Sequence, residues 1–448
     1  MGPAPCAGSP WSSWLAADLQ GRLALIWGVS FFSGSLAQLA ARLSGLPAVV
    51  LLLATGLLLG HAGFAWIQPD QLGRGLEPLV GLLVSLVLFD GGLNLRLAGR
   101  DLQRSVLQLV LVRSVLGLAG GAALAHWVAG LPWPLALVFG AIALATGPTV
   151  VNPLVRQIRL SPFLGRVLEA EGLILEPVSA VLALLLLQLA LGDLGGWQDV
   201  AWRLLMRLGV GVGLGALAGL VLALVLERLE PAEPLAGSVS PDPASGGLSL
   251  QLTLGTLFLL FSGCEALLPE AGLPAAVTAG VVVGLRLDTA ASSLDALISQ
   301  LAMLAITVLF PLLAADVSWA ELSPLGLGGV LCVFGLMLLR FLVVMSAGVG
   351  LPLNAREKLL VSWIAPRGIV TAAVASLFAL QLDQAGVAAA GALKGLVFLT
   401  ILITVGLGGV TAPWLAGRLG LRDVEPPPEG SDPLGADQGG EALPSSSG

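Results

Sequence analysis

Long apolar runs alternate with short polar segments along most of the 448-residue chain. Because a helix needs about 20 predominantly apolar residues to cross a bilayer, these runs predict membrane-spanning helices. The second run is short for a span. We place thirteen spans, near residues 22–42, 46–60, 77–94, 105–127, 133–151, 163–190, 204–226, 248–265, 273–287, 294–313, 322–349, 357–381 and 388–415. The pattern therefore predicts an all-α polytopic membrane protein.

The composition supports this prediction and excludes several classes of protein. Apolar residues make up 56% of the chain and charged residues 11%, against roughly a quarter charged in soluble domains. So few charges could not cover a soluble globule, which excludes a soluble enzyme, a disordered chain and a nucleic-acid binder. The three cysteines and two histidines are too scattered for a disulfide framework or a zinc site, and we expect no cofactor.

The polar segments divide the chain. Residues 1–21 lack the pattern of a signal peptide and are expected outside the membrane. Residues 22–420 form the transmembrane domain. Residues 421–448, rich in Pro, Gly, Ser and acids, predict a disordered acidic cytoplasmic tail. The similar segment 227–247 predicts a flexible loop.

The basic residues orient the predicted helices, because Lys and Arg concentrate in cytoplasmic loops. With the N-terminus outside, the cytoplasmic segments hold Arg42, Arg96, Arg100, Arg104, Arg156, Arg159, Arg166, Arg228, Arg286, Arg356, Lys358, Arg418 and Arg422. The outer segments hold Arg22, Arg74, Arg203 and Arg207. An odd number of spans with the C-terminus in the cytoplasm gives this alternation.

A few charges remain within the predicted spans, where each is costly and needs a reason. Lys394, Glu169 and Glu265 lie close to span ends, and we expect them to reach water or the interface. Glu171 and Glu176 lie deep in the sixth span, about 140° apart around the helix. They either pair with other helices or form an ion or proton site, and we favour the second role for Glu176.

Two spans are interrupted at membrane depth. Gly147-Pro148 breaks the fifth span and Ala365-Pro366-Arg367-Gly368 breaks the twelfth. The first break alone could be a simple proline kink. Arg113 in the fourth span and Arg340 in the eleventh precede these breaks in similar sequences, LVRSVLGLAGG and LLRFLVVMSAG. The two units lie seven helices apart, and an odd offset inverts one relative to the other, as in many transporters.

The sequence resembles NhaP-type sodium/proton antiporters of the monovalent cation:proton antiporter family. The resemblance covers about residues 22–420 and rests on FDGGLNLR, ATGPTVVNPLVR, EGLILEP, LLRFLVV and APRGIVTAAV, in that order. It implies a thirteen-helix fold with two crossed, broken helices. It also implies a homodimer in which a core, about residues 105–190 and 322–415, moves against the remaining helices.

The resemblance also implies a site. Glu176 aligns with the acidic ligand that binds Na⁺, the backbone of Thr146 would add oxygens, and Gly172 is a further expected position of the ion site. Glu171 and Arg340 align with a structural ion pair, and Arg367 with a charge that compensates the second break. Three positions depart from the family pattern: Gly147 and Leu175 replace polar residues, and Pro177 follows the ion ligand.

The function we expect is exchange of a monovalent cation, Na⁺ and also Li⁺, for H⁺, with one carboxylate giving one cation for one proton. A K⁺/H⁺ antiporter is the alternative, and a cation channel is less favoured because the inverted repeat suits alternating access. A membrane enzyme would need a nucleophile–base pair or a metal set, which these spans lack. Asp90 has either a helix-end contact or a role in cation entry or pH sensing. The expected location is a bacterial inner membrane.

Overall fold

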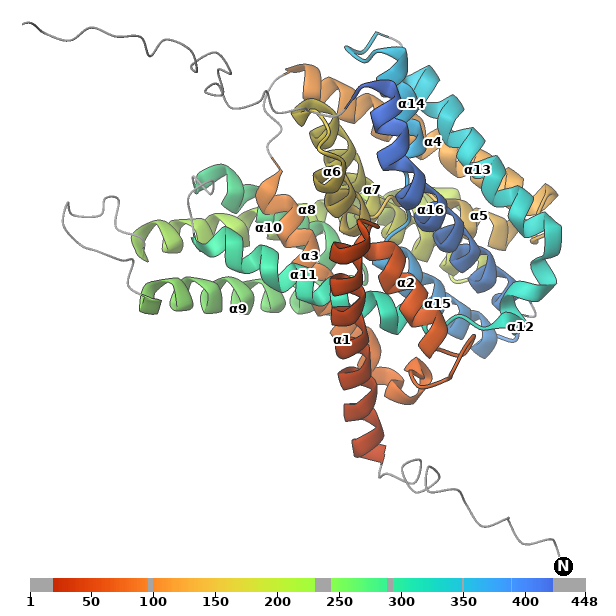
Figure 1. Ribbon diagram of the computed structural model, residues 1–448, viewed down its shortest axis with the longest axis horizontal. Helices are drawn as coiled ribbons and strands as arrows, with labels where there is room; N and C mark the ends of the chain where they lie inside the picture. Colours follow the sequence, from red (N-terminus) through yellow and green to blue (C-terminus); the bar gives the residue numbers. More distant parts are fainter. Residues whose placement is uncertain are drawn as a thin grey trace, which may run out of the picture.

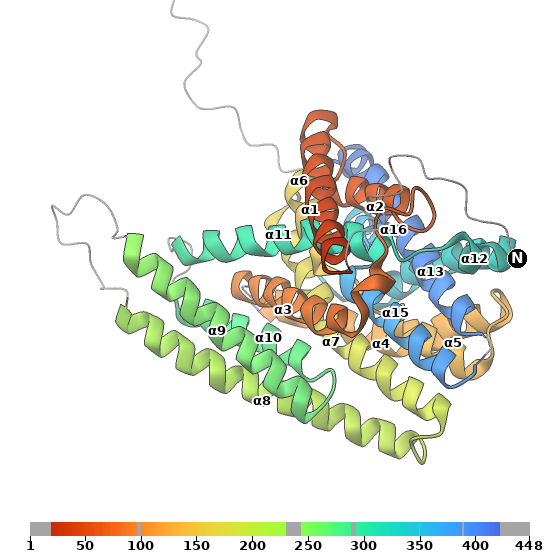
Figure 2. The ribbon, with the colours of Figure 1, turned by 90° about the horizontal axis from the view of Figure 1, so that it is seen from below.

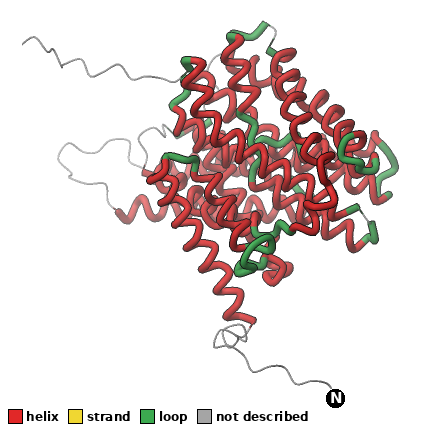
Figure 3. The backbone as a smooth tube through the Cα atoms, turned by 45° about the vertical axis from the view of Figure 1, so that its right-hand side comes forward, coloured by secondary structure: helices red, strands yellow, loops and turns green. Residues whose placement is uncertain are grey.

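The computed structural model describes residues 19–95, 100–229, 243–287, 293–348, 350–387 and 389–421. Every regular element in these ranges is helical (Figure 3). The 1–18 segment, most of the predicted 227–247 loop, the acidic tail and Arg96 lie outside the described residues.

Helices follow the predicted spans closely. Their bounds are α1 (Leu19–Ser44), α2 (Ala48–Leu59), η1 (Pro69–Gly75), α3 (Leu76–Asn94), α4 (Arg100–Trp127), α5 (Trp133–Ile142), α6 (Pro148–Ile158), α7 (Pro162–Leu191), α8 (Trp197–Leu229), α9 (Pro243–Leu267), α10 (Gly272–Arg286), α11 (Ser293–Ala314), α12 (Trp319–Leu322), η3 (Ser323–Leu325), α13 (Gly326–Ala347), α14 (Ala355–Trp363), α15 (Ile369–Gln384) and α16 (Ala390–Leu419). The fifth and twelfth predicted spans each correspond to a pair of helices.

Among the described residues, nine helices are long and apolar enough to cross a membrane. Four shorter apolar helices, α2, α5, α10 and α15, accompany them. These lengths and this composition make the chain an integral membrane protein. Thirteen crossings stays a prediction, because the short helices do not reach the full thickness of a bilayer by themselves.

The helices pack in two groups, which we call the scaffold group and the core group. In the scaffold group, α10 packs on α3 and α8, and α11 packs on α1, α2 and α3. In the core group, α4 packs on α5, α7 and α13, and α15 packs on α16. Figures 1 and 2 show α8 to α11 extending to one side and α4, α5 and α13 to α16 gathered on the other. The predicted division into a moving core and a scaffold stays a prediction.

Proline and glycine explain the two interruptions. Pro148 stands at the first position of α6, where its missing N–H costs nothing. Residues 143–147 therefore leave the helix between α5 and α6, and residues 364–368 do the same between α14 and α15. The two breaks meet, because the Gly147 N–H donates to the carbonyl oxygen of Pro366 at 3.1 Å. The fold thus places two broken helices against each other at the centre of the core group.

Candidate functional site

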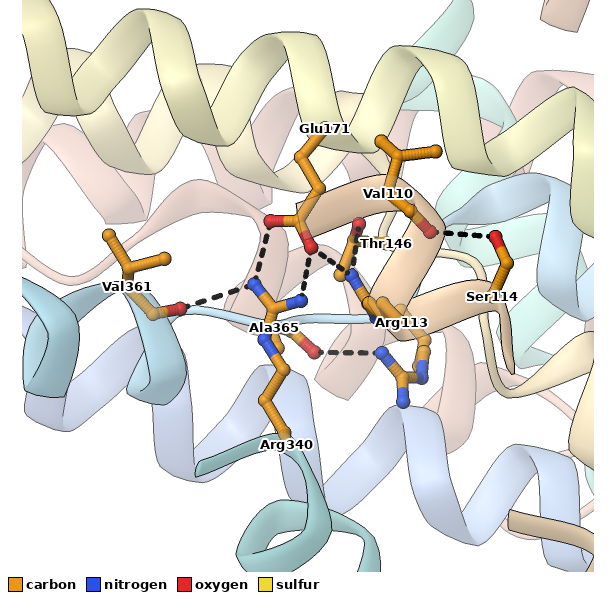
Figure 4. A network of polar contacts seen from close by, with 9 residues as sticks. Val110, Arg113, Ser114, Thr146, Glu171, Arg340, Val361 and Ala365 are labelled. Carbon is orange, nitrogen blue, oxygen red and sulfur yellow. Dashed lines mark hydrogen bonds and ion pairs between the residues drawn. The ribbon is translucent and has the colours of Figure 1, made fainter. Parts of the chain in front are cut away.

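A buried carboxylate next to the breaks is held by two arginines. Glu171 on α7 accepts hydrogen bonds from Arg340 at 2.5 Å and 2.9 Å, one to each oxygen. Arg113 on α4 donates to Glu171 Oε1 at 2.9 Å. Figure 4 shows both guanidinium groups directed at this carboxylate. A carboxylate held by two fixed cations has its charge fully compensated.

The same network holds the first break. Arg113 Nη1 also donates to the hydroxyl oxygen of Thr146, at 3.2 Å. Gly172 lets α7 approach this segment closely, because a Cβ at that position would lie 3.0 Å from the Thr146 carbonyl oxygen. Thr146, Glu171 and Gly172 therefore lie together. The Thr146 side chain accepts a hydrogen bond from Arg113, and the Thr146 carbonyl lies against Gly172.

Glu176 is the opposite case. It lies five residues further along α7 and is 0% exposed, yet neither of its carboxylate oxygens has a hydrogen-bond partner among the described residues. Its backbone carbonyl accepts the Ser179 hydroxyl at 2.8 Å, which is an ordinary bond within the helix. An uncompensated buried carboxylate is costly, so it requires a proton or a cation. Glu171 needs neither.

The second break carries its own buried cation. Arg367 is 5% exposed and donates to the carbonyl oxygen of Ala365 at 3.4 Å, within the interrupted segment. Arg340 likewise donates to the carbonyl of Val361 at 3.2 Å, in the last turns of α14. Both contacts place positive charge on carbonyl groups at the end of a half-helix, where the helix dipole is negative.

A small cavity of about 10 Å³ lies beyond Glu176 toward the C-terminal end of α7. It is lined by residues of α5, the first break, α7 and α15: Ile142, Ala145, Ser179, Ala180, Ala183, Val370, Thr371 and Val374. The hydroxyl of Thr371 is buried there without a described partner. A space of this size is close to the minimum for one water molecule.

Asp90 lies apart from this network. Its Oδ1 accepts the Ser299 hydroxyl at 2.6 Å and the Asn94 amide at 3.2 Å. Ser299 belongs to α11, so Asp90 makes a helix-to-helix contact in the scaffold group. Among the described residues, no cluster of three or more His, Cys, Asp or Glu side chains could hold a metal ion.

Lys394 is not simply a solvated residue. Its ammonium forms ion pairs with Asp316 and Glu321, each at 3.0 Å, and its side chain is 12% exposed. That it reaches the membrane interface stays a prediction. The partners lie more than 70 residues away along the chain, so the local sequence around Lys394 carries no sign of them.

Sequence reasoning did not assign Arg113 to Glu171. The sequence did contain a feature that could have indicated this contact, because Arg113 and Arg340 occupy equivalent places in the two repeats. An inverted repeat brings its two units together around a common centre, and one acid between two such arginines follows from that symmetry.

Comparison with known proteins decides the family. The profile described as "Sodium/hydrogen exchanger, transmembrane" matches residues 28–417. The chain belongs to the sodium/hydrogen exchanger family. The exchanger is therefore a membrane transport protein that exchanges Na⁺ for H⁺, as the motif resemblance implied.

Individual relatives agree with this assignment. The exchanger is 26% identical to Na⁺/H⁺ antiporter 1 of Methanocaldococcus jannaschii over 363 residues, which cover 78% of this chain and 81% of that protein. It is 24% identical to the K⁺/H⁺ antiporter NhaP2 of a Shewanella species over 404 residues, which cover 88% of this chain and 66% of that one.

A solved structure has the same fold. The sodium proton antiporter MjNhaP1 from M. jannaschii, determined at pH 8, superposes with a TM-score of 0.74 at 24% identity. The match covers 89% of this chain and 99% of that one. The overall fold of the chain is thus that of a known antiporter structure.

Proposed function

We propose that the exchanger works by competition between a proton and a monovalent cation for the carboxylate of Glu176. The observation that carries this proposal is the contrast on α7: Glu171 has every oxygen in an ion pair, while the buried Glu176 has no described partner. The oxygens of Thr146, at the first break, are the proposed additional ligands for the cation, with Gly172 allowing α7 close to them.

Exchange follows from the cost of bare charge. Burying an ionised Glu176 without a partner is unfavourable. The protein can therefore change between its inward-open and outward-open states only when Glu176 carries either H⁺ or a partly dehydrated cation. Each half of the cycle then carries one of the two ions, and neither ion crosses without the other returning. Glu171 stays ionised between Arg113 and Arg340, so one cation moves for one proton and no net charge crosses.

Lithium is proposed to share the sodium site. Potassium is the second candidate, supported by the K⁺/H⁺ antiporters among the relatives and by Gly147 and Leu175, which leave the site with fewer oxygens. The membrane location is proposed to be a bacterial inner membrane, with the C-terminus in the cytoplasm on the side of the basic loops. A homodimer, with the core group moving against the scaffold group, completes the proposal.

Everted membrane vesicles test the assignment of Glu176. Sodium added to acidified vesicles should collapse the proton gradient in the parent and not in a Glu176→Gln variant, as read from an acridine dye. Glu169→Gln, seven residues earlier on the same helix and partly exposed, is the matched control and should keep most of the response. Full sodium-driven dequenching in Glu176→Gln would reject the assignment, and the same experiment with K⁺ and Li⁺ gives the cation preference.

A further inference from the structure

An ion-pair cluster lies at the ends of α11 and α16, away from the proposed ion site. The ammonium of Lys394 lies 3.0 Å from Asp316 Oδ2 and 3.0 Å from Glu321 Oε1. It also donates to the backbone carbonyl of Asp316 at 3.1 Å. The side chains of Lys394 and Asp316 are 12% and 9% exposed. Ion pairs this well covered are screened little by salt and contribute more than surface pairs.

The two carboxylates stand on different sides of the boundary between the helix groups. Asp316 directly follows α11, which packs in the scaffold group, while Lys394 on α16 is in the core group. Glu321 lies on α12, which packs on α16. The Lys394–Asp316 pair therefore joins scaffold to core, and the Lys394–Glu321 pair, of equal length, lies within the core side.

Other polar contacts reinforce the same junction. The Ser376 hydroxyl, on α15 of the core group, donates to Asp316 Oδ2. The indole N–H of Trp319 on α12 donates at 2.8 Å to the carbonyl of Ala62, in the segment after α2. At the opposite end of the helices, Gln157 on α6 donates to the Gly45 carbonyl after α1 at 2.8 Å, a contact between neutral partners. The Lys394–Asp316 ion pair thus lies where further hydrogen bonds also join the two groups.

The orientation predicted from the basic loops makes this the outer end. A core that moves against a scaffold has to separate these groups whenever the site opens outward, and the ion pair opposes that separation. We propose that Asp316 and Lys394 form an outer latch, a pair that holds the exchanger closed to the outside and parts in each transport cycle. This inference rests on the proposed movement of the core group, and it assigns to Asp316 and Lys394 a positioning role in exchange.

The latch should control how often the outer path opens. Replacing Asp316 by Asn removes the charge that crosses the boundary and leaves Lys394 paired with Glu321. Replacing Glu321 by Gln removes an equally close contact to the same ammonium but leaves the boundary pair intact. If the latch acts as proposed, Asp316→Asn raises the fraction of molecules open to the outside by about tenfold, because this ion pair is covered to a degree between an exposed and a fully buried pair. Glu321→Gln should change that fraction little.

Thiol labelling from outside measures this opening directly. Ala183 lines the small cavity seven residues beyond Glu176 on α7 and is 0% exposed. In a background with Cys6, Cys264 and Cys332 replaced by Ala, Ala183→Cys is treated with a membrane-impermeant thiol reagent on intact cells. Labelling should be slow in this parent, about tenfold faster with Asp316→Asn, and close to the parent with Glu321→Gln.

A charge exchange separates the latch from general loosening. In a Glu321→Gln background, which removes the carboxylate that Lys394→Asp would otherwise face, the double variant Asp316→Lys with Lys394→Asp restores the pair in reverse and should return labelling toward the parent rate. The proposal is overturned if Asp316→Asn labels as slowly as the parent, if Glu321→Gln accelerates labelling equally, or if the reversed pair labels as fast as the single variant. Labelling does not require ion exchange, so its outcome is independent of the vesicle test of Glu176.

Discussion

The network around Glu171 gives a prediction whose size can be worked from its contacts. Among the described residues, Glu171 supplies the one negative charge paired with Arg113 and Arg340, and Glu171→Gln removes it. Breaking a buried pair by removing one partner costs about 3–5 kcal/mol, because the remaining charges lose their compensation. Arg113→Gln costs less, because Glu171 keeps both hydrogen bonds to Arg340. We expect about 1.5–3 kcal/mol for this one charged hydrogen bond.

The double variant distinguishes a network from independent contacts. If the two residues acted independently, Glu171→Gln with Arg113→Gln would cost the sum, about 4.5–8 kcal/mol. In the double variant one unpaired guanidinium is absent, so its cost should stay near that of Glu171→Gln alone. The expected coupling is at least about 1.5 kcal/mol.

Equilibrium unfolding in mixed micelles, followed by circular dichroism, gives the free energies for this cycle. Glu227→Gln is the control, because Glu227 pairs with Arg286 at 3.8 Å with both side chains well exposed, and its effect should stay within about 0.5 kcal/mol. Single effects that add to within about 0.5 kcal/mol would refute the reasoning, because additivity at that level is the behaviour of residues without a shared partner.

Two further changes test other parts of the account. Gly172→Ala places a Cβ 3.0 Å from the Thr146 carbonyl oxygen and should lower the exchange rate in vesicles by roughly tenfold to a hundredfold. The control Gly209→Ala has no atom within 4 Å of its added Cβ and should leave the rate unchanged. Equal exchange rates in the two variants would show that Gly172 is not part of the site. In the loop between α9 and α10, burial and the nearby carboxylates of Glu265 and Glu77 raise the pKa of Glu270 from 4.5 to about 8. Between pH 4.5 and about 8 the folded state keeps a proton that the unfolded state releases. The free energy of unfolding therefore falls as the pH rises from 4.5 to about 8. Glu270→Gln removes this loss of stability. In thermal unfolding in detergent, the variant should be more stable than the parent, and the difference should be larger at about pH 8.5 than at about pH 5. A difference that does not change with pH would contradict this prediction.

Much of the fold was accessible from the sequence because it depends on local chemistry. Apolar runs of helical length set the helices, and Pro148 and Pro366 mark the interruptions because a proline cannot continue the helical hydrogen bonding. Glu171 and Glu176 stand out because both carboxylates lie deep within one long apolar run. These features need no knowledge of distant residues.

The rest depends on contacts between distant segments. The Lys394 ammonium pairs with Asp316 and Glu321 across more than 70 residues, and the sequence near Lys394 names neither partner. Arg113 meets Glu171 across 58 residues and Thr146 across 33. The sequence identified which residues carry charge at membrane depth, but which cation faces which acid is decided by how the helices pack.

The central claim is that one carboxylate, Glu176, carries either the cation or the proton. Proton release on cation binding tests it most directly, using purified full-length exchanger in weakly buffered detergent solution with a pH-sensitive dye. Adding Na⁺ should release one proton for each sodium bound, and Glu176→Gln should release none, while choline, a cation too large for the site, should have no effect on either protein. Undiminished sodium-dependent proton release from Glu176→Gln would contradict the account.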